Sequence, residues 1–262
     1  MPEVDHPLMA VSGITPATIK LDLLHLVDLG VASHLYGNLV WDLVEDHAEG
    51  GNRAMKLHQV NKQIVEAYKT CGIPASQRLK RLNLSDVCAG GDEYPVLKHC
   101  KGRRIRHFSK VAVELASHHT ATMWGQKRLE AMKAMDKVYD LADLPSTVFS
   151  TADFQKFKRG CESLLGHYGW LAKDAMKHKL CRYSITQKHH MLACRYIEQC
   201  RFLAPRMTWC YGPEGFMSMC IKIAAASVRG TSPAKLPGKV LEKFSFSYHL
   251  LLSGLLDLSG ED

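Results

Sequence analysis

Apolar residues recur every three to four positions along most of the chain, which is the period of an amphipathic α-helix. The clearest case spans residues 151–179, where the apolar side chains fall on one stripe. Ser150 precedes this stripe, and we expect its hydroxyl to cap the helix by accepting from the backbone amide of Asp153. Similar patterns predict further helices over 31–46, 53–68, 105–118, 129–141, 189–203, 214–228 and 233–256.

Two short runs lack the helical period and are bounded by turn-forming residues, at 17–25 and 207–211. We interpret each as a strand. If both belong to one sheet, they lie side by side. The pattern as a whole predicts a mainly α protein with at most two or three strands.

The 262 residues are 46% apolar, which is enough for a sizeable core. Ten prolines and 19 glycines are too few for a disordered or collagenous chain. The longest apolar stretch, 250–258, is interrupted by Ser253, Gly254 and Asp257, so no membrane span is expected. The acidic N-terminus has no apolar segment after it, so we expect no secretory signal.

Nine cysteines include no Cys-x-x-Cys pair, and an odd number does not favour a disulfide framework. We therefore expect free thiols in an intracellular protein, with the nucleus as one compartment to consider. Structural zinc usually needs tight cysteine pairs, so buried apolar cysteines are the simpler interpretation. The sequence also has no phosphate-binding glycine loop and no Gly-x-Ser-x-Gly nucleophile motif.

Charge is distributed unevenly along the chain. Its net value is +8, but residues 1–50 carry −7, so the remainder carries +15. A basic surface of this size can meet a polyanion such as DNA, or it can simply be solvated. The densest basic cluster begins at Lys101 and opens a predicted helix, with Arg103, Arg104, Arg106 and Lys110. Arginine suits phosphate because its planar fork donates in pairs.

Asp22 ends the first apolar run, and His25 follows three residues later. A carboxylate at the end of a strand is a typical oxygen ligand for Mg²⁺ in phosphoryl chemistry. An Asp near a helix start can also be a cap, and Asp28 is the candidate for that role.

These residues resemble a known family. Asp22-x-x-His25, followed by a helix and a long all-helical stretch, is similar to the second half of the RNase H-like (DDE) transposase core of the CACTA, hAT and P-element type. The downstream half is similar as well, in the Lys-His-His of 188–190, the Ala-Pro-Arg of 204–206 and the run of 207–217.

The resemblance implies a helical insertion flanked by a small remnant of an RNase H-like α/β core. Residues 1–50 would hold a core strand and helix, 51–203 the basic insertion, and 204–262 a short strand and the last core helices. Asp22 would be the second catalytic carboxylate and Glu214 the third, holding Mg²⁺ with their carboxyl groups within about 8 Å of each other. His25 would face the same cleft. DNA phosphates would meet the basic cluster together with Lys188, His190 and Arg206.

One departure from the family changes the functional expectation. Only 21 residues precede Asp22, so the strands that carry the first catalytic Asp are missing. The chain therefore resembles a truncated or domesticated transposase with impaired strand cleavage, acting alone, as a homo-oligomer or with a chain that supplies the missing strands. The alternative is a non-enzymatic α-helical module that binds nucleic acid or protein.

Overall fold

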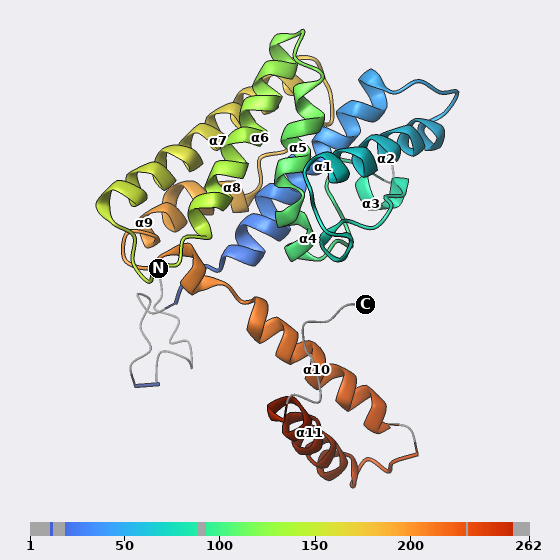
Figure 1. Ribbon diagram of the computed structural model, residues 1–262, viewed down its shortest axis with the longest axis vertical. Helices are drawn as coiled ribbons and strands as arrows, with labels where there is room; N and C mark the ends of the chain where they lie inside the picture. Colours follow the sequence, from blue (N-terminus) through green and yellow to red (C-terminus); the bar gives the residue numbers. More distant parts are fainter. Residues whose placement is uncertain (1–10, 13–18, 89–92, 229, 254–262) are drawn as a thin grey trace, which may run out of the picture. The chain divides into compact units, whose positions relative to one another are not determined.

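The computed structural model describes residues 11–12, 19–88, 93–228 and 230–253, and it is mainly helical with no strand in these ranges (Figure 1). The mainly α class is thereby confirmed. The elements in chain order are the π-helix η2 (Leu24–Ala32), α1 (Ser33–Asp42), the π-helix η3 (Leu43–His47), α2 (Arg53–Thr70), the 3₁₀-helix η4 (Ala75–Gln77), α3 (Leu84–Val87), α4 (Gly102–His107), α5 (Ser109–Ser117), α6 (Met123–Ala142), α7 (Thr151–Lys177), α8 (Gln187–Met191), the π-helix η5 (Leu192–Tyr196), α9 (Ile197–Gln199), the 3₁₀-helix η6 (Pro205–Thr208), α10 (Tyr211–Val228) and α11 (Leu236–Leu252).

The chain divides into two compact units, Met1–Trp209 and Cys210–Asp262. The second unit is a helical hairpin in which α10 packs against α11. In the first unit, helices from the predicted segments 1–50 and 51–203 share one hydrophobic core. No helix in the described ranges has both the length and the apolar character needed to cross a membrane.

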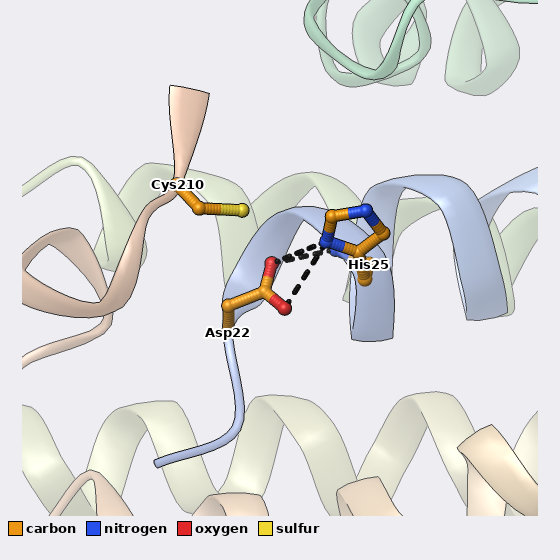
Figure 2. Close-up of side chains that lie close together, drawn as sticks. All are labelled: Asp22, His25 and Cys210. Atoms are coloured by element: carbon orange, nitrogen blue, oxygen red, sulfur yellow. Dashed lines mark hydrogen bonds and ion pairs between the residues drawn. The ribbon is translucent and has the colours of Figure 1, made fainter. Parts of the chain in front are cut away.

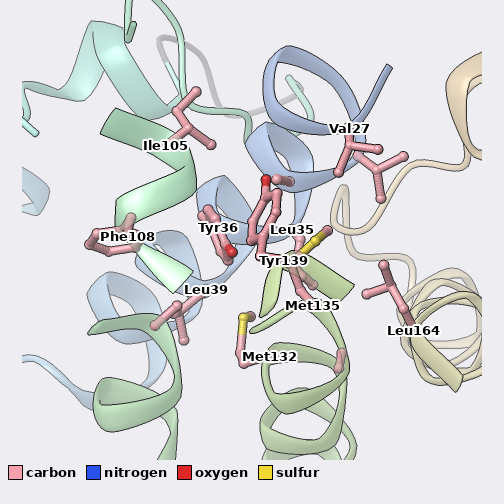
Figure 3. Close-up of a cluster of buried hydrophobic side chains, with 14 of the residues drawn as sticks. Val27, Leu35, Tyr36, Leu39, Ile105, Phe108, Met132, Met135, Tyr139 and Leu164 are labelled. Atoms are coloured by element: carbon pink, nitrogen blue, oxygen red, sulfur yellow. The ribbon is translucent and has the colours of Figure 1, made fainter. Parts of the chain in front are cut away.

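Residues 24–47 pass through η2, α1 and η3 without a break, and most of their side chains are buried. Almost every side chain of α1 is buried, including those of the polar residues Ser33, Asn38 and Asp42. Tyr36 packs edge-on against Phe108, with ring centroids 5.4 Å apart. Met132 and Met135 of α6 belong to the same cluster, which is the core of the first unit (Figure 3).

The two longest helices, α6 and α7, lie side by side (Figure 1). Thr122 caps α6 by accepting from the amide of Gly125 at 3.1 Å, and Ser150 caps α7 by accepting from the amide of Asp153 at 3.1 Å. The cap predicted at Ser150 is confirmed. Such a cap satisfies one of the backbone donors that a helix start leaves unpaired.

The two predicted strands are wrong for the residues that the structure describes. Residues 17 and 18 lie outside them, residues 19–22 pair with no strand, and the chain is helical from Leu23. The backbone of Leu21 donates to Oε1 and accepts from Nε2 of Gln199, both at 2.8 Å. A glutamine side chain thus satisfies the groups that a neighbouring strand would pair. At the second run, residues 205–208 form η6, which begins at Pro205.

The capping role expected for Asp28 is also wrong. Asp28 lies inside η2 and is completely buried. The helix begins earlier in the sequence, and the carboxylate of Asp22 accepts from the backbone amide of His25 at 2.8 Å. Because the first apolar run is helical rather than extended, the start of the helix moves from Asp28 to Asp22.

A buried charge network, which we call the Asp42 network, joins α1 to later parts of the chain. Asp42 and Arg128 have no exposed surface and form an ion pair at 3.2 Å. The Asp42 carboxylate also accepts from Trp124 Nε1 at 3.0 Å, from Arg182 Nη1 at 2.8 Å and from the Tyr183 hydroxyl at 2.8 Å. Four donors surround one carboxylate, as a buried charge requires.

Tyr183 completes this network at a cost in backbone energy. Its φ of 55° is unfavourable for a bulky residue. The backbone amide of Tyr183 donates to Asn38 at 2.7 Å, and its hydroxyl donates to Asp42. Burial, and then the charge of Asp42, raise the pKa of Tyr183, so the hydroxyl stays protonated and donates. These buried bonds offset the backbone strain.

Candidate functional site

A groove of about 310 Å³, which we call the basic groove, lies between two connecting segments of the first unit. One wall is formed by residues 79–83 with Asp86 of α3, and the other by residues 98–101 with Arg104 of α4. The backbone amide of Lys98 donates to the carbonyl of Asp86 at 2.7 Å. This backbone hydrogen bond joins the two walls of the groove.

Side chains of α2 hold the first wall in place. The Tyr68 hydroxyl accepts from the amide of Leu79 at 2.8 Å, and buried Asn61 exchanges two hydrogen bonds with the backbone of Leu82, at 2.9 and 3.0 Å. Leu79 and Leu82 are buried, while Lys80 and Arg81 between them are exposed. The two buried leucines thus hold the segment in place and leave Lys80 and Arg81 facing solvent.

The lining of the groove is strongly positive. Among the described residues that line it, the one carboxylate is Asp86, which accepts from the amide of Asn83 at 2.8 Å as part of a capping box, and the five cationic side chains are Lys80, Arg81, Lys98, Lys101 and Arg104. Lys98 also pairs with Glu93 at 2.8 Å. Burial, and then the charge of Asp86, raise the pKa of Cys100 to about 11, so this lining thiol is neutral at pH 7. The arrangement fits an anion.

The basic cluster predicted from the sequence is divided by the fold. Arg104 lines the groove, Arg103 is exposed on the same short helix, and Lys110 is exposed on α5. Arg106 is 7% exposed and pairs with Asp143 at 2.7 Å. Its guanidinium also lies over the rings of Tyr139 and Trp209, with centroids 4.9 and 4.5 Å away. Arg106 therefore stabilises the core and is not presented to a phosphate.

A second cluster lies at the start of η2, where Asp22 meets His25. The imidazole Nδ1 of His25 lies 3.1 and 3.2 Å from the two carboxylate oxygens of Asp22 (Figure 2). Both residues come from the first unit, whereas Cys210, also drawn in Figure 2, belongs to the second unit. Within the described part of Met1–Trp209, no further His, Cys, Asp or Glu places a ligand atom within 4.8 Å of both.

Lys188 extends this cluster from α8. Its ammonium donates to the carbonyl of Leu29 in η2 at 2.9 Å. A Cβ atom at Gly30 would lie 2.5 Å from Lys188 Cδ, so a larger residue there would require the lysine side chain to shift. Burial lowers the pKa of Lys188, while the charge of Asp22 raises it. The lysine binds the backbone of the π-helix, a helix type that is frequent at functional sites.

His189 is buried beside this cluster, with 3% of its surface exposed. Its Nδ1 accepts from the backbone amide of Thr186 at 3.2 Å, so the imidazole caps α8. Burial, and then His34, lower the pKa of His189 to about 4. Burial, and then Lys188, lower the pKa of His34 as well. Both imidazoles are neutral at pH 7.

The other predicted site residues lie apart from these two clusters or outside the described side chains. His190 is exposed, with Nδ1 3.5 Å from Cys194 Sγ. Arg206 is exposed and lies over Trp209, 5.6 Å from its ring centroid. Glu214 belongs to α10, but its side chain lies outside the described residues. Its approach to Asp22 therefore stays a prediction.

Sequence reasoning missed Lys80, Arg81, Lys98 and His99 as candidate ligand-binding residues. A signal was present at the first pair, since Lys80 and Arg81 lie between two leucines in an otherwise polar connection. Such leucines anchor a connecting segment and leave the residues between them facing solvent. The second wall had no comparable signal, because only the fold brings residues 98–101 opposite residues 79–83.

Comparisons with known proteins add no relative to this picture. No protein-family model matches the sequence, and no curated protein or solved structure is significantly similar to the chain.

Proposed function

We propose that this chain is a nucleic-acid-binding protein and that the basic groove is its contact with the phosphate backbone. The observation that carries the proposal is the lining of the groove, where the described residues supply five cations and one carboxylate that already caps a helix. Arg and Lys on a fixed backbone bind phosphate oxygens well, and their contacts release counterions from the nucleic acid. The transposase descent that the resemblance implies is compatible with this function.

The test compares two variants of equal charge. Lys80→Ala/Arg104→Ala removes one cation from each wall of the groove, whereas Lys133→Ala/Lys173→Ala removes two exposed lysines from α6 and α7, which contribute nothing to the groove. Binding of a labelled DNA oligonucleotide to the full chain is measured by fluorescence anisotropy over a series of salt concentrations. We expect the groove variant to bind at least about 10-fold more weakly at low salt, with a logarithmic salt slope smaller by about 2.

Equal losses in the two variants would show that diffuse charge, and not the groove, carries the binding. No binding by the natural chain at low salt would refute the proposed function altogether.

A second candidate is metal-dependent DNA strand cleavage at Asp22, the activity that the resemblance implies. The observation in its favour is the contact of Asp22 with His25 at the start of the π-helix η2, with Lys188 bound to the carbonyl of Leu29 in the same helix. Mg²⁺ prefers oxygen ligands, however, and the described first unit supplies only the one carboxylate there. These residues alone do not fit Mg²⁺. Glu214 or another chain would have to complete the site.

A nicking assay on supercoiled DNA with added Mg²⁺ distinguishes the two candidates. The natural chain is compared with Asp22→Asn and Glu214→Gln. We expect binding without nicking. Mg²⁺-dependent nicking that both substitutions abolish would establish the catalytic candidate.

A further inference from the structure

The basic groove has an apolar floor as well as a cationic rim. Leu79 and Leu82 are buried and line it from below, while Lys80 and Arg81 stand at its edge. Its volume of about 310 Å³ lies at the lower end of the range for small-molecule pockets, roughly 300–1,000 Å³. The groove is therefore comparable in volume to a small-ligand pocket.

Among the described lining residues, His99 is the one with a positive φ, 56°, which is uncommon for a residue other than glycine. Two other non-glycine residues of the described chain share such a φ, and the fold accounts for both. Tyr183 is held by the Asp42 network, and Lys179 follows the end of α7, where a left-handed residue commonly terminates a helix. In the described residues, no side-chain hydrogen bond or ion pair holds the exposed imidazole of His99.

Residues in sparsely populated backbone conformations cluster at active sites and ligand-binding positions. The strain at His99 places an exposed aromatic ring at the rim of a cationic groove. Proteins that bind single strands combine these same two features, a positive groove that follows the backbone and a ring on which a base stacks. In a duplex the bases are already stacked and paired, so they cannot enter such a pocket without base flipping.

We propose that the basic groove seats one nucleotide of a single-stranded nucleic acid, with its base against His99 and the two leucines and its phosphates on the cationic rim. This inference rests on the proposed function, since it names the form of nucleic acid that the groove takes. DNA and RNA present the same phosphate and a similar base face, so the experiment compares a single strand of each.

The experiment measures binding of the full chain to a single-stranded DNA, a single-stranded RNA and a DNA duplex of matched sequence, at one salt concentration. His99→Gly removes the ring and relieves the positive φ, so the melting temperature should stay the same or rise. Lys179→Gly is the matched control, since it relieves a similar φ outside the groove. We expect the natural chain to bind the better single strand about 10-fold more tightly than the duplex. His99→Gly should lose about 10-fold in single-strand affinity and less than 2-fold in duplex affinity.

Equal or tighter duplex binding would overturn this inference and leave the proposed function intact. A single-strand preference that His99→Gly does not change would also overturn it, because the base would then lie elsewhere. Absence of binding to all three nucleic acids would instead refute the proposed function itself.

Discussion

The Asp42 network and the basic groove use the same kinds of side chain for opposite purposes. In the network, Arg128 has no exposed surface and its guanidinium pairs with a buried carboxylate. In the groove, Lys80 and Arg81 are exposed on a wall that buried leucines hold in place. Both regions are fixed by buried contacts, but only the groove leaves its positive charge facing solvent.

This difference shows that the presence of a basic residue in a sequence does not tell whether its charge is buried or faces solvent. Arg104 and Arg106 are two positions apart on one short helix, yet Arg104 lines the groove and Arg106 is packed between a carboxylate and aromatic rings. A residue two positions later on a helix points about 200° around the axis. Neighbours of this kind are therefore divided between core and surface.

The largest expected effect on stability comes from removing the Asp42 carboxylate at the centre of the network. Asp42→Ala leaves Arg128 buried without its partner, so we expect the free energy of unfolding of the first unit to fall by about 3–5 kcal/mol. Urea denaturation followed by circular dichroism measures the change. Asp140→Ala, at an exposed position of α6, is the control and should cost less than about 0.5 kcal/mol. Similar losses in both variants would contradict a structural role specific to Asp42.

The second-largest expected effect is a loss of folding stability of the first unit in acid. The pKa of His189 is about 4 in the fold, against 6.5 ordinarily, so the unfolded chain binds the proton first as pH falls. Stability is therefore lost progressively from about pH 6.5 to pH 4, by up to about 3 kcal/mol from this residue. His34 has a lowered pKa too and adds to the loss in the same direction.

His189→Asn separates titration from capping, because the Asn oxygen can still accept from the amide of Thr186. Urea midpoints at pH 7, 6, 5 and 4 should show a flatter pH dependence for this variant than for the natural chain. An unchanged slope would show that His189 does not control the acid response.

A smaller effect should distinguish the two neighbouring arginines. Arg106→Ala removes an ion pair and two cation–π contacts, and we expect it to cost about 1–3 kcal/mol of stability without changing DNA affinity. Arg104→Ala should do the reverse, with stability within about 0.5 kcal/mol and DNA binding several-fold weaker. Chemical denaturation and anisotropy on the same two samples provide the comparison. If both variants changed both properties alike, the division between core and groove would be wrong.

The periodic pattern predicted most of the helices because helix formation depends on residues three and four positions apart, which the sequence displays directly. The cap at Ser150 followed from the same local chemistry. The strands failed for a different reason, since a strand exists only if a distant backbone pairs with it. At Leu21 that place is taken by the side chain of Gln199, 178 positions away.

The sequence by itself determined the mainly helical class, the surplus of positive charge after residue 50 and the presence of a basic cluster at residues 101–110. Only the tertiary structure decided which of those charges are accessible, because burial depends on packing between segments that are distant in the chain. It placed Arg106 and Arg128 in the core, and it brought residues 79–83 opposite residues 98–101 to form the basic groove. The cost of burying an unpaired charge makes this division sharp, since a guanidinium either finds a buried partner or remains in water.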